Sequence, residues 1–161
     1  MKYREMAGEK ISVLGFGCMR FPTTSKNAED IDAEKSAKML VYAIENGVNY
    51  FDTAYVYHGG KSESFIGGVL KPYRDKIHIA TKCPIWEVKC EEDFDRLLNE
   101  QLERLQTDYI DFYLMHALDK DRFKNVVEKF NLIDKLNKAK ADGKIRHIGF
   151  SFHDDVETLK K

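Results

Sequence analysis

Short apolar segments alternate with amphipathic segments along most of this chain, and that alternation limits the possible folds more than any other feature. The apolar segments are residues 48–52, 76–82, 109–116 and 144–151. Between them lie stretches whose apolar residues recur at helical spacing. Strands that alternate with helices form parallel sheets with right-handed crossover connections. The order of segments therefore predicts an α/β fold built on a parallel sheet.

The ends of the chain and the connecting segments complete this prediction. Residues 1–13 are expected to form a short hairpin with its turn near Ala7 and Gly8. The sequence ISVLGFGCMRF, residues 11–21, is expected to be a first buried strand that ends in a loop at Gly17. The predicted helices cover residues 33–46, 62–70, 91–105 and 121–141, and a further helix begins within residues 153–161.

Length and charge restrict the class of protein. The 161 residues are 43% hydrophobic, which is enough for one globular domain with a buried core, so we expect residues 1–161 to form a single domain. The net charge is −1 with acids and bases interspersed, so no basic surface for nucleic acid is expected. No apolar run approaches the roughly 20 residues that span a bilayer. The N-terminus does not resemble a signal peptide.

The cysteine pattern indicates a reducing compartment. Cys18, Cys83 and Cys90 are odd in number and form no C-x-x-C pair, which argues against a disulfide framework or a zinc site. We therefore expect a soluble, cytoplasmic protein that has neither a membrane nor a nucleic-acid partner.

Two architectures fit the predicted strands. About five strand–helix units are recognisable, whereas a closed (β/α)8 barrel needs eight units and typically about 250 residues. A barrel would therefore be represented by its N-terminal portion, truncated at the C-terminus. An open flavodoxin-like sheet would accommodate five strands within this length. Length alone favours the open sheet, and the polar motifs favour the barrel.

Three of the predicted strands end in a polar residue at the point where the apolar run stops. Asp52, Lys82 and His116 close the first three apolar segments, and Tyr57 lies in the loop that follows Asp52. The carboxyl ends of parallel strands meet at one edge of an α/β fold, where the loops carry ligands and chemistry. We therefore predict that these four side chains form one site.

The four residue types fit the chemistry of carbonyl reduction. A lysine ammonium beside a tyrosine stabilises the phenolate left after proton transfer, and an aspartate keeps that lysine charged and oriented. His116 can hydrogen-bond a substrate carbonyl oxygen and position it. Tyr57 would donate a proton to that oxygen as a hydride reaches the carbonyl carbon. A rival hypothesis, a metal-dependent hydrolase with Asp52, His58 and His116 as ligands, is disfavoured because Lys82 lies among them.

The same motifs resemble those of the aldo-keto reductase family. The matching pieces cover nearly the whole chain in the family's order: LGFGCM, NYFDTAYVYHGGKSE and the following IG, IATK, LERLQTDYIDFYLMH and GKIRHIGFS. The resemblance implies the N-terminal portion of a (β/α)8 barrel, closed at its base by the hairpin. It also implies an NAD(P)H-dependent oxidoreductase that reduces a small aldehyde or ketone. The implied catalytic tetrad is Asp52, Tyr57, Lys82 and His116, with Tyr57 as the general acid/base.

The resemblance further implies a cofactor site, for which NADP(H) is expected in preference to NAD(H). The family's contacts to the nicotinamide and its ribose fall on Gly17, Cys18, Met19, Asp52 and Ser151. Many relatives have Ser-Asn where this chain has Ser151-Phe152. The forms HGGKSE and GFSFHDD resemble a bacterial subgroup whose longer members add a cysteine-rich iron–sulfur segment. No such segment is present here, so no iron–sulfur cluster is expected in this chain.

A non-catalytic role is the alternative to an enzyme. Some members of the family are channel-associated subunits, so the chain could be an inactive fragment or a binding subunit with the same fold. A half-barrel would expose two strand edges and part of an apolar interior, through which self-association could occur. Tyr55, His58 and Asp111 are expected to be structural, and Trp86 is expected either to line the substrate pocket or to pack at its rim.

Overall fold

The computed structural model describes residues 1–160 and begins with a hairpin that lies apart from the main sheet. Strands β1 (Tyr3–Met6) and β2 (Glu9–Ser12) pair antiparallel. Ala7 and Gly8 have φ values of 54° and 84°, as a tight hairpin turn requires. The predicted hairpin is therefore confirmed. The prediction of a single domain over 1–161 includes one residue, Lys161, that lies outside the described residues.

The main sheet has five strands, all parallel, and each pairs with the next strand in the chain. A doubly wound, flavodoxin-like sheet would contain a reversal of strand order. The consecutive order is that of adjacent strands in a (β/α)8 barrel, so the partial barrel is confirmed over the open sheet. The strands are β3 (Phe16–Gly17), β4 (Tyr50–Asp52), β5 (His78–Cys83), β6 (Ile110–Leu118) and β7 (Ile145–Phe152).

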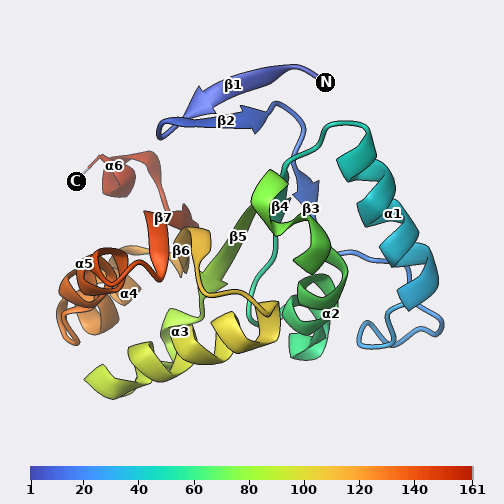
Figure 1. Ribbon diagram of the computed structural model, residues 1–161. Helices are drawn as coiled ribbons and strands as arrows, with labels where there is room; N and C mark the ends of the chain where they lie inside the picture. Colours follow the sequence, from blue (N-terminus) through green and yellow to red (C-terminus); the bar gives the residue numbers. More distant parts are fainter. Residues whose placement is uncertain (161) are drawn as a thin grey trace.

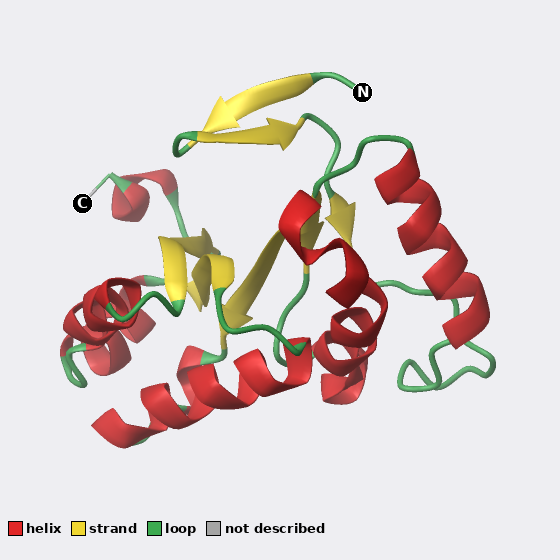
Figure 2. Cartoon of the chain, viewed as in Figure 1, coloured by secondary structure: helices red, strands yellow, loops and turns green. Residues whose placement is uncertain are grey.

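Four helices surround the outside of the curved sheet (Figures 1 and 2). They are α1 (Ala33–Glu45), α2 (Lys61–Leu70), α3 (Glu91–Leu105) and α5 (Leu132–Ala141). Shorter segments are η1 (Tyr57–Gly60), η2 (Lys71–Lys76), η3 (Ile85–Glu87), α4 (Lys120–Arg122), η4 (Phe123–Glu128) and α6 (Val156–Leu159). None of the helices within residues 1–160 has the length and apolar character needed to cross a bilayer.

The hairpin is fixed to the end of the sheet at which the strands begin (Figure 1). The Ser12 amide donates to Asn49 Oδ1 at 2.7 Å, and the Asn49 amide donates to Ser12 Oγ at 3.1 Å. Asn49 directly precedes β4. This reciprocal pair places the hairpin at the opposite end of β4 from Asp52, so it leaves the carboxyl edge of the strands uncovered.

The buried strand predicted to begin at Ile11 and to end in a loop at Gly17 is confirmed only at its end. Ile11 and Ser12 belong to β2, Val13 and Leu14 are exposed, and β3 contains only Phe16 and Gly17. The physical reason is that residues 9–12 pair antiparallel with β1. The chain must therefore leave the hairpin before it can join the parallel sheet.

The prediction of one helix over residues 121–141 is wrong. The segment is divided into the short α4, the π-helical turn η4 and α5. The break lies at Asn131, whose φ of 52° is left-handed, a conformation that asparagine tolerates better than most residues. The break lets Val127 and Leu132 on either side of it be completely buried.

Helices α2 and α3 pack closely against each other. A Cβ atom added at Gly67 would lie only 2.4 Å from the backbone oxygen of Arg104, so the two helices can approach this closely only with glycine there. Ile66 on α2 and Leu98 on α3 are both buried in the main hydrophobic core. The helix that follows β4 is thereby fixed against the helix that follows β5.

Candidate active site

Strand register brings Asp52, Lys82 and His116 to the same face of the sheet. Asp52 pairs with Ala80, and Lys82, two residues further along β5, pairs with Leu114. His116 follows two residues later on β6. Because residues two apart on a strand project to the same face, these side chains converge at the carboxyl edge.

Lys82 is the centre of the site. Its Nζ donates to Asp52 Oδ1 at 2.7 Å, to the Thr53 carbonyl oxygen at 2.6 Å and to the Tyr57 hydroxyl at 3.1 Å. An ammonium has three donors, so these three acceptors use all of them. The lysine is only 5% exposed, whereas the Asp52 side chain is 32% exposed. A buried cation therefore contacts a carboxylate that is open to solvent.

Tyr57 is held beside this cation by the short helical turn η1. Its amide donates to the Ala54 carbonyl at 3.1 Å, and the Lys82 Nζ lies 4.7 Å from the centre of its ring. The hydroxyl accepts the lysine hydrogen bond, so its own proton remains available for another acceptor. The structure therefore brings Asp52, Tyr57 and Lys82 into direct contact.

His116 lies next to Tyr57 and is neutral. The two ring centres are 6.1 Å apart, with the rings nearly perpendicular. Burial, followed by the charge of Lys82, lowers the pKa of His116 to about 4. Its Nδ1 is buried and has no hydrogen-bond partner among residues 1–160. The ring of Trp86 packs against it with centres 5.1 Å apart, so Trp86 lies at the rim of the site.

A β-bulge sets the direction of His116. The register between β6 and β7 shifts between Met115 and Leu118, and Ala117 within it has a left-handed φ of 54°. The Ala117 amide donates to Ser151 Oγ at 2.7 Å. Bulges next to active sites commonly reorient a side chain. Ser151, for which the family resemblance implies a cofactor contact, thus lies directly beside the predicted tetrad.

The other residues assigned to the cofactor lie on the far side of Asp52. Gly17 pairs with Asp52, and the Cys18 amide donates to the Asp52 carbonyl at 2.8 Å. The Cys18 side chain is completely buried, and burial raises the pKa of its thiol, so only its backbone could face a ligand. Met19 is 54% exposed, and a Cβ at Gly17 would meet no atom within 4 Å. This open space fits a cofactor that approaches the backbone closely.

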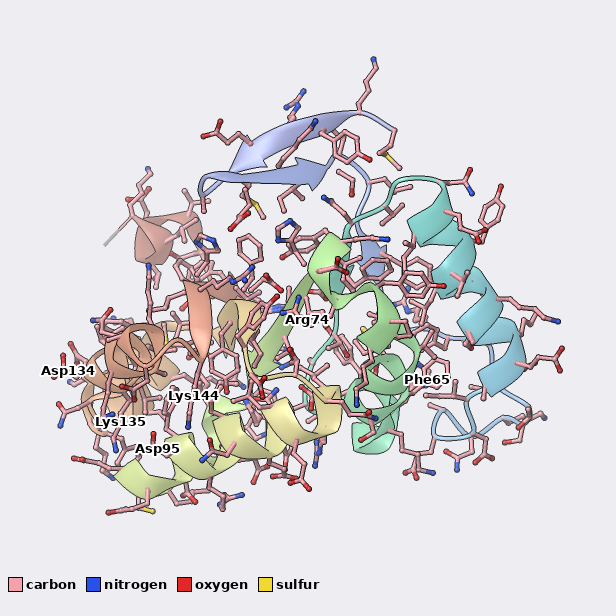
Figure 3. The ribbon with its side chains drawn as sticks, in the orientation of Figure 1. Phe65, Arg74, Asp95, Asp134, Lys135 and Lys144 are labelled. Atoms are coloured by element: carbon pink, nitrogen blue, oxygen red, sulfur yellow. The ribbon has the colours of Figure 1, made fainter. Side chains whose placement is uncertain are left out.

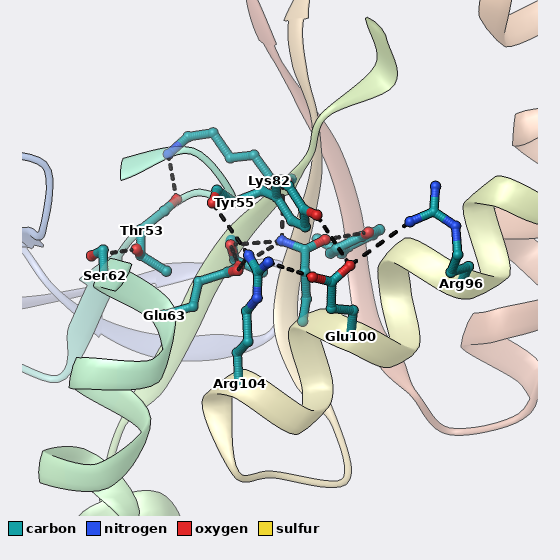
Figure 4. A network of polar contacts seen from close by, with 11 residues as sticks. Thr53, Tyr55, Ser62, Glu63, Lys82, Arg96, Glu100 and Arg104 are labelled. Carbon is teal, nitrogen blue, oxygen red and sulfur yellow. Dashed lines mark hydrogen bonds and ion pairs between the residues drawn. The ribbon is translucent and has the colours of Figure 1, made fainter. Parts of the chain in front are cut away.

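A buried polar network beneath Lys82 was not predicted. Glu63 is fully buried on α2, and its Oε1 accepts from Thr81 Oγ1 and from Gln101 Nε2, both at 2.6 Å. Gln101 Nε2 also lies 3.1 Å from the Lys82 carbonyl oxygen, and Gln101 Oε1 accepts from the Tyr113 hydroxyl at 2.7 Å. Figure 4 shows how this network connects α2 and α3 to the end of β5.

Two sequence signals point weakly to this network. Glu63 lies in the first turn of α2, where an acid is usually explained by its favourable interaction with the helix dipole. Gln101 is a polar residue on the otherwise leucine-rich buried face of α3. The pKa of Glu63 is raised by burial, against the opposing effects of Thr81, Gln101 and Arg104. An acid in the first helical turn can thus be a buried anchor for the neighbouring strand.

Three residues expected to be structural are found in structural contacts. The Tyr55 hydroxyl donates to Glu100 Oε2 at 3.0 Å, away from Lys82. Asp111 is fully buried among positively charged partners, and His58 is 6% exposed and hydrogen-bonded on both ring nitrogens. Within residues 1–160, no group of three or more potential metal-ligating side chains is positioned to hold an ion.

Comparison with known proteins shows which proteins share this arrangement. The family model described as "Aldo/keto reductase family" matches residues 13–161. Glyoxal reductase from Bacillus subtilis is 32% identical over 160 residues, which covers 95% of this chain and 51% of that protein. The chain spans about half the length of the curated relatives it matches.

Solved structures agree with the sequence comparison. The holo form of an aldo-keto reductase from Bacillus halodurans superimposes with a TM-score of 0.78 at 31% identity, covering 94% of this chain and 50% of that one. An aldo-keto reductase from Klebsiella pneumoniae in complex with NADPH gives a TM-score of 0.74 at 26% identity, covering 94% of this chain and 49% of that one.

Proposed function

Because the chain belongs to the aldo/keto reductase family, we propose that it serves NADPH-dependent reduction of a small aldehyde or ketone to an alcohol, with Tyr57 as proton donor. The observation that supports this most directly is the contact of Lys82 Nζ with both Asp52 Oδ1 and the Tyr57 hydroxyl. A structural ion pair would not require a tyrosine hydroxyl as its third partner. This arrangement instead prepares a phenol to release its proton.

The proton transfer follows from these contacts. Tyr57 accepts a hydrogen bond from Lys82, which leaves its own proton to be donated to a substrate oxygen. The phenolate that forms is stabilised by the adjacent ammonium, because opposite charges within a few ångströms favour the ionised form. Asp52 orients Lys82 through their 2.7 Å ion pair, and the Asp52 carboxylate stays partly in contact with solvent.

His116 complements the proton donor by orienting the substrate. Its lowered pKa keeps the imidazole neutral, so it can donate one hydrogen bond to a carbonyl oxygen without a net charge. The ring lies beside Tyr57 and Trp86. A carbonyl oxygen held between His116 and Tyr57 would receive both the positioning hydrogen bond and the proton.

The cofactor would be held on both sides of Asp52. Bound NADPH supplies a hydride to the carbonyl carbon. The open backbone at Gly17 and Cys18, the exposed Met19 and the Ser151 hydroxyl are the groups that would contact it, together with Asp52. The similarity to an aldo-keto reductase described in complex with NADPH supports this choice.

The proposal is tested first by cofactor binding. Trp86 is the only tryptophan in the sequence, and it packs against His116, so its fluorescence should report ligands at this site. We expect saturable quenching on titration with NADPH, tighter than with NADH, followed by turnover with a panel of aldehydes and ketones. Saturable binding with no turnover of any carbonyl would favour the non-catalytic alternative, and no binding would contradict the proposal for this chain.

A further inference from the structure

His58 directly follows the proposed proton donor and has an unusual backbone. Its φ is 54°, in the left-handed region that few residues other than glycine adopt. Gly59 and Gly60 follow with φ values of 64° and 88°. These three consecutive left-handed residues reverse the chain directly after Tyr57. The reversal allows the Tyr57 hydroxyl to reach Lys82 while the next side chain is buried elsewhere.

Both nitrogens of the His58 ring are used. The Phe21 amide donates to Nε2 at 3.1 Å, so Nε2 carries no proton. Nδ1 therefore carries the proton and donates it to the Ala28 carbonyl oxygen, 2.5 Å away. The imidazole also packs on the Phe21 ring, with centres 5.5 Å apart. His58 is thus fixed as one neutral tautomer between two points of the segment 21–28.

The segment that His58 holds continues from the proposed cofactor contacts. Ser62 Oγ donates to the Cys18 carbonyl at 3.0 Å, so Cys18 is anchored by the start of α2. Phe21 is anchored by His58. Met19 and Arg20, between these two anchors, are both exposed. Residues 57–62 therefore anchor the chain on both sides of the exposed Met19 and Arg20, through Ser62 and His58. The same six residues include Tyr57, the proposed proton donor.

We propose that His58 is a positioning residue that holds the loop 18–21 at a fixed place relative to Tyr57. The inference rests on the function proposed above, because the loop is assigned to the cofactor and Tyr57 to the proton. A hydride donor and a proton donor must be aligned on one carbonyl group, and small misplacements reduce rates strongly. An apolar side chain at this position would leave the Phe21 amide and the Ala28 carbonyl without these partners.

The test compares His58→Asn with a control in the same segment. Asparagine tolerates the left-handed backbone but is too short to make both ring contacts. The variant therefore removes the side-chain hydrogen bonds of His58 while it keeps the backbone conformation. Loss of two hydrogen bonds should raise the Kd for NADPH, followed by Trp86 fluorescence, roughly five- to thirtyfold and lower kcat in the folded protein. The control is Ser25→Ala, which also removes two hydrogen bonds from the segment: the 2.6 Å bond that Ser25 Oγ donates to Asp30 Oδ2 and the 2.9 Å bond that it accepts from the Asn27 amide. Both bonds lie at the surface, and their loss should leave both values unchanged.

The outcomes distinguish the alternatives. If His58 only stabilises the fold, His58→Asn will lower the unfolding temperature but leave Kd and kcat of the folded protein at wild-type values, and the inference is overturned. An equal shift in Ser25→Ala would overturn it as well. Failure of the wild-type protein to bind NADPH would instead refute the proposed function, and this is seen before any variant is made.

A second measurement does not depend on a variant that folds. Nitrogen-15 NMR of the wild-type protein should show His58 as a neutral imidazole with its proton on Nδ1 and with Nε2 as an acceptor. A rapidly exchanging mixture of tautomers, or a proton on Nε2, would show that the Phe21 amide is not held by this ring and would overturn the inference.

Discussion

The sheet contains two buried charged clusters, one at each end, and they are built differently. At the carboxyl edge Lys82 contacts Asp52 and Tyr57. Towards the amino end Asp111 on β6 pairs with Arg74 at 2.6 Å and Arg146 at 3.0 Å. Figure 3 marks Arg74, which η2 directs toward this strand. Both clusters lie in one sheet, yet only the first has the features of a reaction site.

The Asp111 carboxylate is fully buried and contacts several partners. Besides the two arginines, the Ile79 amide donates to Asp111 Oδ2 at 2.9 Å. The guanidinium groups of Arg74 and Arg146 each lie 3.9 Å from the centre of the Tyr109 ring. Burial would raise the pKa of Asp111, but the nearby His78 and Arg74 outweigh it, so the pKa of Asp111 is lowered. Arginine does not release its proton in proteins, so neither guanidinium can act as a proton donor. His78 Nδ1 lies 3.6 Å from Asp111 Oδ1. Within residues 1–160, no tyrosine hydroxyl accepts a hydrogen bond from these arginines as Tyr57 does from Lys82.

The comparison shows that solvent access of the carboxylate and the presence of a phenol, more than burial of charge, separate the two roles: the Asp52 side chain is 32% exposed, whereas Asp111 is fully buried. The Lys82 cluster includes a phenol that can release a proton, a partly exposed carboxylate, and an adjacent His116 whose Nδ1 has no partner in the described part of the chain. Asp111 has partners on both oxygens. Titratable groups with free hydrogen-bonding capacity are expected where a ligand completes the site.

The largest expected effect is loss of turnover in Tyr57→Phe. Phenylalanine keeps the ring and removes the proton, so kcat should fall about 10²- to 10⁴-fold. Loss of one hydrogen bond to Lys82 should change the free energy of unfolding by only about 0.5–1.5 kcal/mol. Steady-state kinetics and urea unfolding measure the two quantities. A variant that reduces carbonyls at the wild-type rate would place the proton donor elsewhere.

Asp111→Asn should give the opposite result. Removing the carboxylate leaves the charge of Arg74, whose side chain is only 15% exposed, without its carboxylate partner, which costs about 3–5 kcal/mol of unfolding free energy. The Kd for NADPH in the folded protein should not change. Asp95→Asn is the matched control, since its 2.9 Å pair with Lys135 joins α3 to α5 at the surface (Figure 3) and is worth about 0–1 kcal/mol. A stability loss no greater than in this control would remove the distinction between the clusters.

Glu63→Gln should fall between these two cases. The amide keeps the shape but presents an NH₂ group to Thr81, Gln101 or Arg104, so one buried contact is lost at a cost of about 1–3 kcal/mol. Because Gln101 also bonds the Lys82 carbonyl, we expect a small decrease in kcat alongside the loss of stability. Thermal unfolding and kinetics test this. An unchanged unfolding temperature would show that the negative charge of Glu63 does not stabilise the folded protein.

The smallest expected effect is a difference in the pH at which each cluster lowers the free energy of unfolding on acidification. The pKa of His116 is lowered to about 4 in the folded protein, below its ordinary value near 6.5. Between these two pH values the unfolded protein binds more protons than the folded protein, so the free energy of unfolding falls as the pH falls. The pKa of Asp111 is lowered below its ordinary value near 3.9, so its contribution is complete above that pH and is lost below it. Urea unfolding measured from pH 7 to pH 3 should show that the free energy of unfolding falls less steeply between pH 6.5 and pH 4 in His116→Asn than in the wild-type protein. The decline at lower pH should be missing in Asp111→Asn, and identical pH profiles in all three proteins would contradict both assignments.

The position of the site could be predicted from sequence because it depends on strand ends. Each of Asp52, Lys82 and His116 ends an apolar run, and the two-residue repeat of a strand fixes the face on which it lies. The consecutive strand order was anticipated only through the family motifs, since length alone favoured an open sheet. The contact of Lys82 with Asp52 follows from that register, whereas the contact with Tyr57 also depends on the turn η1, which follows β4.

The features that were missed depend on contacts that no local pattern contains. Glu63 and Gln101 meet only because α2 and α3 pack closely at Gly67. The break at Asn131 is a choice of backbone angle that asparagine permits but does not require. The short β3 follows from the pairing of residues 9–12 with β1, after which only Phe16 and Gly17 pair with β4.

The left-handed Ala117 has a consequence for how this protein could be stabilised. An alanine at φ 54° is less stable than a glycine there by about 1–2 kcal/mol, so Ala117→Gly is a candidate stabilising change. The same change would remove a constraint on the direction of the neighbouring imidazole. Thermal stability and the fixed position of His116 therefore make opposite demands on residue 117, and selection for heat resistance alone would be expected to loosen the carboxyl edge of the sheet.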